Sequence, residues 1–114
     1  MSAYSPLVLS GSTNGTPIPV VATVSPGTVI HLAANMDEVY IFASNVTASA
    51  ATLYVQFGST TDPGGMLVKN FGISANSGPV PIAVGQRLSA AVTVLAFGTA
   101  ASAINITGWV NRIT

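Results

Sequence analysis

Short runs in which apolar and polar residues alternate are the feature that most constrains the fold of this 114-residue chain. In the clearest run, Thr52–Phe57, the three apolar residues of the alternation are expected to face inward, while Thr52, Tyr54 and Gln56 are expected to face outward. A spacing of two is typical of a β-strand, because successive side chains of a strand point to opposite faces. Gly, Pro, Asn and Ser bound these runs, and charged helix-forming residues are scarce, so the sequence predicts an all-β fold.

Eight runs of this kind follow one another, separated by turn-forming residues, which is typical of a sandwich or barrel. We predict a single domain over residues 1–114, an antiparallel β-sandwich of about eight strands with a jelly-roll-like arrangement. In the second run, Ile30 and Leu32 are expected to point inward. The expected strands are Ile18–Val24, Thr28–Ala33, Val39–Ser44, Thr52–Phe57, Met66–Phe71, Val80–Val84, Val92–Phe97 and Ile104–Val110.

A weak internal repeat suggests two similar halves of four strands each. The segment Pro17–Val20 is answered by Pro79–Ile82, and Phe42–Val55 is answered by Phe97–Val110. Proline cannot donate a hydrogen bond to a neighbouring strand, so the two Pro-x-Pro segments are expected at sheet edges or strand starts. The two longer segments are interpreted as hairpins around turns rich in Ala, Ser and Thr.

The first 16 residues differ from the rest of the chain. The short apolar group Leu7–Leu9 is flanked by Ser, Gly, Thr and Asn, and Asn14-Gly15 is a strong turn signal. We interpret residues 1–16 as an extended N-terminal arm with a hydrophobic anchor that pairs with another element. A frayed terminus is the alternative.

The charge content is unusually low. The sequence holds three basic and three acidic side chains, 5% of its residues against a usual fraction of about 25%. A net charge of zero argues against capture of nucleic acid or of an anionic membrane surface, because both need clustered Lys and Arg. No apolar stretch approaches the ~18 residues that a membrane span needs, and the N-terminus lacks the pattern of a signal peptide. We therefore expect synthesis in the cytoplasm without a signal peptide, and no membrane partner.

The mean hydropathy of +0.62 also needs a structural explanation, because the sequence shows no membrane span. One interpretation is a soluble domain coated with Ser, Thr and Asn. The other is a subunit whose surface is largely covered by neighbouring subunits, which would bury the apolar excess at interfaces. The second interpretation predicts a homo-oligomer.

No arrangement of residues predicts catalysis, and we expect no cofactor and no metal. Asp37 and Glu38 are adjacent, so on a strand their side chains would point to opposite faces of the sheet. They are interpreted as residues that cap a turn before a strand. Asp62 precedes a proline in a turn. His31 is the only histidine and is expected on the less buried side of its strand, in a structural role. With one His, no Cys and three scattered acids, no zinc or EF-hand spacing can be assembled. Calcium held by Asp37 or Asp62 with backbone carbonyls stays open.

Aromatic residues leave carbohydrate binding open as a rival function. Jelly rolls commonly serve lectins, and Tyr40, Tyr54 and Trp109 are candidates for a surface on which a sugar stacks. Trp109 is expected on the strand face opposite Ile106 and therefore partly exposed. A tryptophan at a sandwich edge or a subunit contact is the alternative for this residue.

The C-terminal stretch Ala103–Ile113 (AINITGWVNRI) is the most recognisable piece of the sequence. It resembles the ending of small β proteins encoded in the structural gene modules of tailed bacteriophages. Val39–Gly58 and the run from Gly58 to Val84 are similar to the same group. The resemblance implies a virion component on the capsid surface, a capsid decoration (cement) protein with a β-sandwich fold, frequent trimeric assembly and the major capsid protein as partner.

On this basis the sequence predicts a non-enzymatic virion structural protein that decorates and stabilises a phage capsid through subunit contacts. The alternatives are a carbohydrate- or receptor-binding module of a virion fibre or appendage, and a jelly-roll coat or tail-tube subunit. The residues predicted to make the contacts are Tyr4, Leu7, Leu9, Arg87, Trp109 and Arg112.

Overall fold

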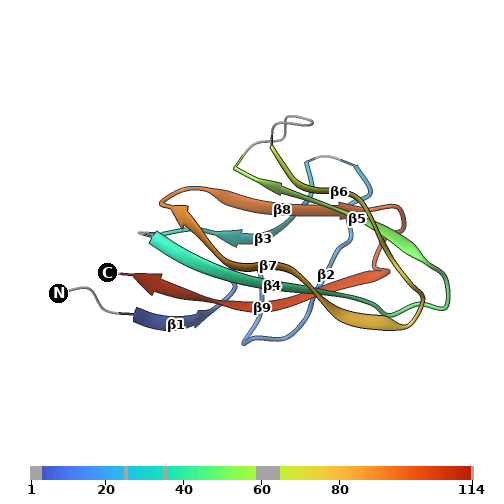
Figure 1. Cartoon of the computed structure of the whole chain (residues 1–114), viewed down its shortest axis with the longest axis horizontal. Coiled ribbons are helices and arrows are strands. Elements are labelled where there is room, and N and C mark those ends of the chain that lie inside the picture. Colours follow the sequence, from blue (N-terminus) through green and yellow to red (C-terminus); the bar gives the residue numbers. More distant parts are fainter. Residues whose placement is uncertain (1–3, 25, 35, 59–64, 114) are drawn as a thin grey trace.

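The protein is described by a computed structural model that covers residues 4–24, 26–34, 36–58 and 65–113. These residues form nine β-strands and no helix, so no element is long and apolar enough to cross a membrane as a helix (Figure 1). The strands are β1 (Tyr4–Val8), β2 (Ile18–Pro19), β3 (Thr28–Leu32), β4 (Met36–Asn45), β5 (Ala51–Phe57), β6 (Met66–Ile73), β7 (Ser77–Ser89), β8 (Thr93–Gly98) and β9 (Ile104–Ile113).

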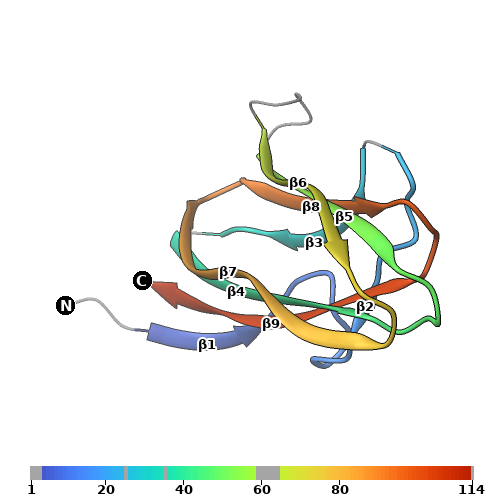
Figure 2. The same ribbon diagram turned by 45° about the vertical axis from the view of Figure 1, so that its right-hand side comes forward.

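The strands form two antiparallel sheets packed face to face (Figures 1 and 2). Sheet A has the order β1-β9-β4-β7, with β2 beside β9, and sheet B has the order β3-β8-β5-β6. The pairings are nested: β5 pairs with β6, β4 with β7, β3 with β8, and β1 and β2 with β9. A long antiparallel ribbon folded over itself in this way is a jelly roll, which confirms the predicted fold class.

Strands β1 and β2 share one position at the edge of sheet A. β1 pairs with the C-terminal half of β9, from Tyr4 opposite Ile113 to Val8 opposite Trp109, and β2 pairs with its N-terminal half. The N-terminal arm predicted over residues 1–16 therefore does pair with another element, at Tyr4–Val8, and Leu9 packs in the core, so this part of the arm forms an edge strand of the sandwich. The physical reason is that β9 would otherwise present an open edge of unpaired backbone groups.

The internal repeat does not consist of two hairpins. Phe42–Val55 runs from β4 in sheet A to β5 in sheet B, and Phe97–Val110 runs from β8 in sheet B to β9 in sheet A. Each segment crosses from one sheet to the other. The Pro-x-Pro segments do lie in edge strands, β2 and β7, as their missing backbone donors predict.

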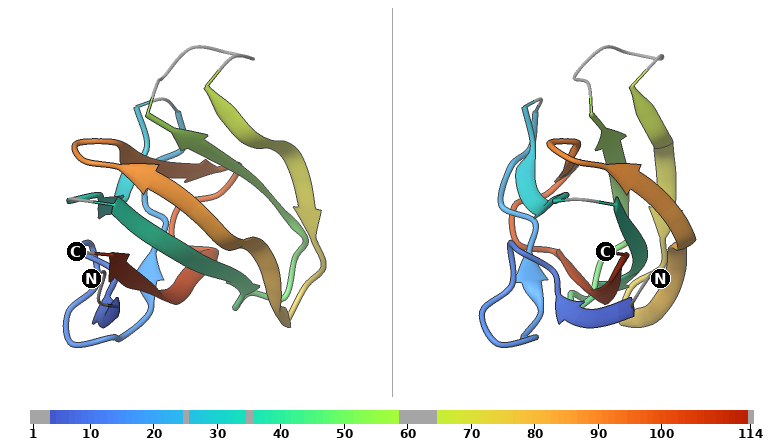
Figure 3. Two further views of the ribbon diagram at one scale, coloured as in Figure 1. Left: turned by 60° about the vertical axis from the view of Figure 1, so that its left-hand side comes forward. Right: turned by 90° about the vertical axis from the view of Figure 1, so that its left-hand side faces the viewer.

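The core fills the space between the two sheets, which lie one above the other in the end-on view on the right of Figure 3. The alternation predicted for β4 is confirmed, with a strict sequence of buried and half-buried residues along the strand. The largest apolar side chains that are fully buried are Leu9, Ile30, Ile41, Leu53, Ile104, Ile106, Val20, Val39, Val55 and Val94.

Two predicted orientations are wrong because strand register shifts interrupt the alternation. The β3–β8 register shifts between Val29 and His31, and both Ile30 and His31 are buried while Leu32 is half exposed. The β5–β6 register shifts on both sides of Val55, and Gln56, predicted to face outward, is buried. A β-bulge adds a residue to one strand, so period two fails locally. The expected first strand is also shortened to β2, and the predicted turn at Asp62 lies outside the described residues.

Gly108 allows β9 to approach β4 closely. Its φ is +152°, and a Cβ added at this position would lie 1.9 Å from the carbonyl oxygen of Tyr40. Only glycine fits such a backbone contact. The contact brings Trp109, the next residue, beside the ring of Tyr40.

Candidate functional site

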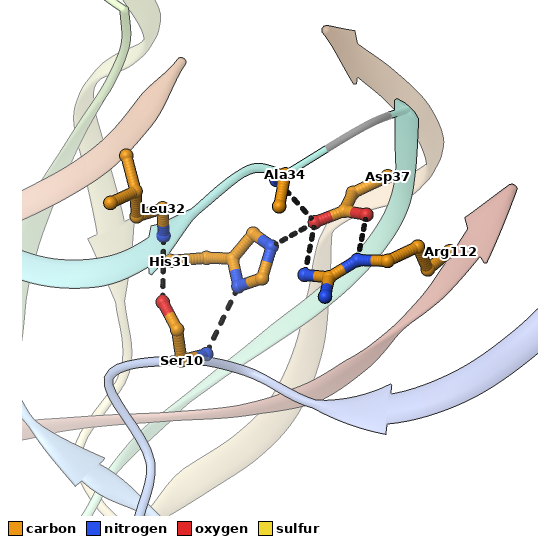
Figure 4. A network of polar contacts seen from close by, with 6 residues as sticks. All are labelled: Ser10, His31, Leu32, Ala34, Asp37 and Arg112. Atoms are coloured by element: carbon orange, nitrogen blue, oxygen red, sulfur yellow. Dashed lines mark hydrogen bonds and ion pairs between the residues drawn. The ribbon is translucent and has the colours of Figure 1, made fainter. Parts of the chain in front are cut away.

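A cluster of polar side chains bridges the two sheets at one end of the sandwich (Figure 4). His31 comes from β3 in sheet B, Asp37 from β4 and Arg112 from β9 in sheet A. Asp37 Oδ1 accepts a hydrogen bond from Arg112 Nε at 2.9 Å, and Oδ2 accepts from Arg112 Nη2 at 3.1 Å and from His31 Nε2 at 2.7 Å. The backbone N–H of Ala34 donates a fourth bond to Oδ2 at 3.1 Å. The carboxylate is thus held by four donors.

Asp37 is ionised at neutral pH although its side chain is 0% exposed. Burial by itself raises the pKa of a carboxyl group, because it disfavours the charged form. Here the hydrogen bonds from Arg112, His31 and Ala34, with the charge of Arg112, outweigh burial and lower the pKa of Asp37 from 3.8 to about 2. The same contact raises the pKa of Arg112, mainly through the hydrogen bond to Asp37.

Two hydrogen bonds assign the roles of the two ring nitrogens of His31. Its Nδ1 accepts a hydrogen bond from the backbone N–H of Ser10 at 3.0 Å, so Nε2 carries the proton that is donated to Asp37. The hydroxyl oxygen of Ser10 does not face the ring and instead accepts from the N–H of Leu32 at 2.7 Å. A serine nucleophile would need its hydroxyl, not its backbone, on the histidine, so this geometry does not activate Ser10.

One expectation about this cluster is wrong. His31 was expected on the less buried side of its strand but is 1% exposed, because the bulge in β3 turns it inward. Asp37 was expected to cap a turn before a strand; it lies buried near the start of β4, and its carboxylate accepts the N–H of Ala34 in the connection that precedes this strand. Arg112 bonds to Asp37 and its side chain is 27% exposed, so its predicted role as a contact residue stays a prediction. The predicted opposite orientation of Asp37 and Glu38 is confirmed, since Glu38 is only half-buried on the outer face.

The outer face of sheet A carries a row of apolar side chains that crosses all four strand positions. From one edge of the sheet to the other, the row consists of Val8 on β1, Trp109 on β9, Tyr40 on β4 and Val84 on β7. Each residue is the cross-strand partner of the next. Such partners lie on the same face of a sheet. We call these four residues the apolar row. Trp109 is 43% exposed and Val84 67% exposed, so the predicted partial exposure of Trp109 is confirmed.

Trp109 stacks with two aromatic rings of β4, Tyr40 of the apolar row and Phe42 beside it. The centroids of Tyr40 and Trp109 are 4.8 Å apart with an interplanar angle of 12°, and Phe42, two residues further along β4, lies 5.9 Å from Trp109. The ring of Trp109 thus packs one face against β4, while Val8 is its partner on the β1 side. The stacked rings of β4 therefore cover one face of Trp109.

A polar row runs beside the apolar row on the same face. Asn111 on β9 is the cross-strand partner of Glu38 on β4, and Glu38 is the partner of Arg87 on β7. Arg87 Nε donates to Glu38 Oε2 at 3.2 Å, and the Tyr40 hydroxyl donates to Glu38 Oε1 at 2.8 Å. The hydrogen bond from Tyr40 lowers the pKa of Glu38, and the same bond raises the pKa of Tyr40.

The third aromatic residue of the proposed sugar-stacking surface lies elsewhere. Tyr54 is on β5 in sheet B, where it stacks on Phe97 with centroids 4.6 Å apart, and its hydroxyl bonds to Asn70. Tyr40 and Trp109 are on sheet A, so the expected surface of three aromatics does not form. Each sheet instead carries its own stacked pair.

The predicted contact residues separate in the structure. Arg87 and Trp109 are exposed on the outer face of sheet A, and Leu7 is partly exposed on β1. Leu9 is 1% exposed, so its side chain packs in the core and cannot reach a partner. Tyr4 begins β1 opposite Ile113.

Within the described parts of the chain, no surface pocket is found and no group of three potential metal-ligating side chains gathers. Asp62, one of the two aspartates considered for calcium, lies outside these residues. The other, Asp37, already has four hydrogen-bond donors around its carboxylate, which is the opposite of what a cation needs.

Comparisons with protein families, with curated proteins and with solved structures found no match to this chain.

Proposed function

We propose that this chain is a non-enzymatic structural protein of a phage virion, which decorates and stabilises the capsid through contacts between subunits. The observation that carries the proposal is the apolar row on the outer face of sheet A, exposed on a chain with very few charges. Exposed apolar rows of this kind mark surfaces that other proteins cover. The partners proposed are further copies of the chain and the major capsid protein.

Two acidic and two basic side chains are paired within the chain, which supports a role in contacts between protein surfaces rather than in catalysis. Asp37 and Arg112 are used between the sheets, where they hold β4 and β9 to each other and to His31 of β3. Glu38 and Arg87 pair with each other on the surface. Contacts between such surfaces depend little on salt, because few charges are available to be screened.

Decoration stabilises a shell by mass action. A protein that binds only the assembled shell stabilises it by RT ln(1 + [L]/Kd) at each site, and the effect is multiplied over many sites. A small rigid domain suits this task, because little conformational entropy is lost when it binds. The jelly roll of this chain is such a scaffold, although the fold alone does not specify the role.

The alternative, a carbohydrate- or receptor-binding module of a fibre or appendage, is less well supported by the aromatic geometry. A sugar stacks on the open face of an aromatic ring, whereas Trp109 packs one face on Tyr40 and has Val8 as its neighbour on the other strand. A contact with another protein surface uses ring edges as readily as ring faces.

Purified particles from the phage that encodes the chain provide the test. Quantitative mass spectrometry should find the chain in hundreds of copies, in a fixed ratio to the major capsid protein. A handful of copies per particle would instead support the appendage, and absence of the chain from particles would end the proposal. Glycan-array binding by the isolated protein, lost in Trp109→Ala, would favour the carbohydrate alternative.

A further inference from the structure

We propose that the outer face of sheet A binds the same face of a second copy of this chain, related to the first by a two-fold axis. The inference rests on the proposed function, because it assigns one of the proposed subunit contacts to named residues. A two-fold contact closes on itself and gives a dimer, so it departs from the trimer that the sequence resemblance implies.

The first support is the continuity of the apolar row. Val8, Trp109, Tyr40 and Val84 lie opposite one another across β1, β9, β4 and β7, so the row spans the full width of the sheet. Val84 is the most exposed member, at 67%, and lies on the edge strand β7. A second copy turned by 180° would place the partner's Val84 against Tyr40 and Tyr40 against the partner's Val84.

The second support is charge complementarity of the face with itself. Glu38 and Arg87 are neighbours across β4 and β7 and carry opposite charges, so the described outer face of sheet A has no net charge. With the two-fold axis running along the strands between β4 and β7, Glu38 of each copy faces the partner's Arg87. Such reciprocal pairs are characteristic of an isologous interface.

The position of the axis also sets the area of the contact. With the axis between β4 and β7, these two strands of one copy lie against β7 and β4 of the other copy, and β9 and β1 lie outside the overlap. Two strand positions at about 4.8 Å and a strand of ten residues such as β4 give an overlap of about 10 Å by 33 Å, or about 650 Å² buried in total, which is the size of a weak, concentration-dependent interface.

The main test is the oligomeric state of the full chain and of two matched variants, measured by sedimentation velocity over a range of concentrations. Val84→Asp introduces a charge into the apolar row, whereas Val24→Asp introduces the same charge at a valine of similar exposure (69%) outside sheet A. We expect a concentration-dependent dimer for the natural chain, an increase in the dimer Kd of at least about tenfold for V84D, and no change for V24D. A urea midpoint for each variant shows that it is folded.

A charge exchange tests the orientation of the two copies. Glu38→Arg and Arg87→Glu should each weaken self-association, because like charges then face each other across the axis. An equimolar mixture of E38R and R87E, and separately the double variant carrying both changes, should restore it. A natural chain that stays monomeric, a V84D chain that dimerises as well as V24D, or a mixture no tighter than the single variants would overturn the inference.

Different experimental results would contradict this inference and the proposed function. If particles contain hundreds of copies of the chain but V84D dimerises normally, another surface makes the contact and the virion role stands. If V84D abolishes dimerisation but particles lack the chain, the interface stands without that role.

Discussion

Asp37 and Glu38 are neighbours on β4, and each pairs with an arginine, yet the two pairs do different work. Asp37 points between the sheets, where Arg112, His31 and Ala34 surround a fully buried carboxylate. Glu38 points outward and pairs with Arg87, whose side chain is more than half exposed. Because neighbouring residues on a strand face opposite sides of the sheet, Asp37 forms a buried ion pair and Glu38 forms an ion pair at the surface. Loss of the buried pair should lower the free energy of unfolding far more than loss of the surface pair.

The largest expected effect is that of removing the inner carboxylate. Asp37→Ala leaves the guanidinium of Arg112, the Nε2–H of His31 and the N–H of Ala34 without their shared acceptor, so we expect the free energy of unfolding to fall by about 3 kcal/mol. Urea unfolding followed by Trp109 fluorescence measures it. Glu38→Ala is the matched control one residue away and should lower the urea midpoint much less. Equal losses in the two variants would refute the distinction between the pairs.

A smaller effect is expected on acidification. The pKa of Asp37 is about 2 in the folded chain and 3.8 is its ordinary value, so the folded state holds the proton less tightly. The resulting stabilisation is fully present above about pH 4 and is lost as the pH falls towards 2. Its size is about 1–2 kcal/mol, allowing for screening on the partly exposed Arg112 side.

The pH dependence of unfolding in Asp37→Asn measures this contribution. The difference in unfolding free energy between the natural chain and D37N should shrink as the pH falls from 4 to 2. Glu38→Gln should retain the Asp37 contribution over the same range. A difference between the natural chain and D37N that is independent of pH would contradict the assignment.

The smallest effect on stability is expected from the outer pair. Arg87→Ala removes an exposed arginine whose ion pair with Glu38 is partly solvated, so the urea midpoint should stay within experimental error. The same variant should weaken self-association if the outer face of sheet A is an interface. A marked loss of stability in R87A would show that the outer pair is structural after all.

The sequence contained the signal for part of the inner cluster. Asp37 is in phase with Val39, Ile41 and Ala43, and Arg112 is in phase with Ile106 and Val110, so extending the alternation to the strand ends would have placed both side chains inside. The sequence prediction instead ended the strands at Val39 and Val110, with Asp37 in a turn and Arg112 at a subunit contact. A buried acid and a partly buried base on adjacent strands are compatible with that phase when they satisfy each other.

His31 and Gln56 could not have been placed from the sequence. Each lies beside a register shift, and a bulge is set by pairing with the neighbouring strand rather than by local residue type. The stacking of Trp109 on Tyr40 likewise depends on which strands are neighbours and on the close approach at Gly108. The all-β class followed from periodicity, because alternation and regularly spaced turn residues predict strands packed in a sandwich or barrel, whereas the nested pairing depends on contacts between distant segments.

The most direct test of the division between inner and outer residues is hydroxyl-radical footprinting of the chain in purified particles and as a dilute isolated protein. The prediction is that oxidation of Trp109 falls strongly in the assembled state, because the outer face of sheet A is then covered, whereas buried His31 is unreactive in both. Equal oxidation of Trp109 in particles and in the isolated chain would contradict it, since the apolar row would then remain open to solvent in the proposed assembly.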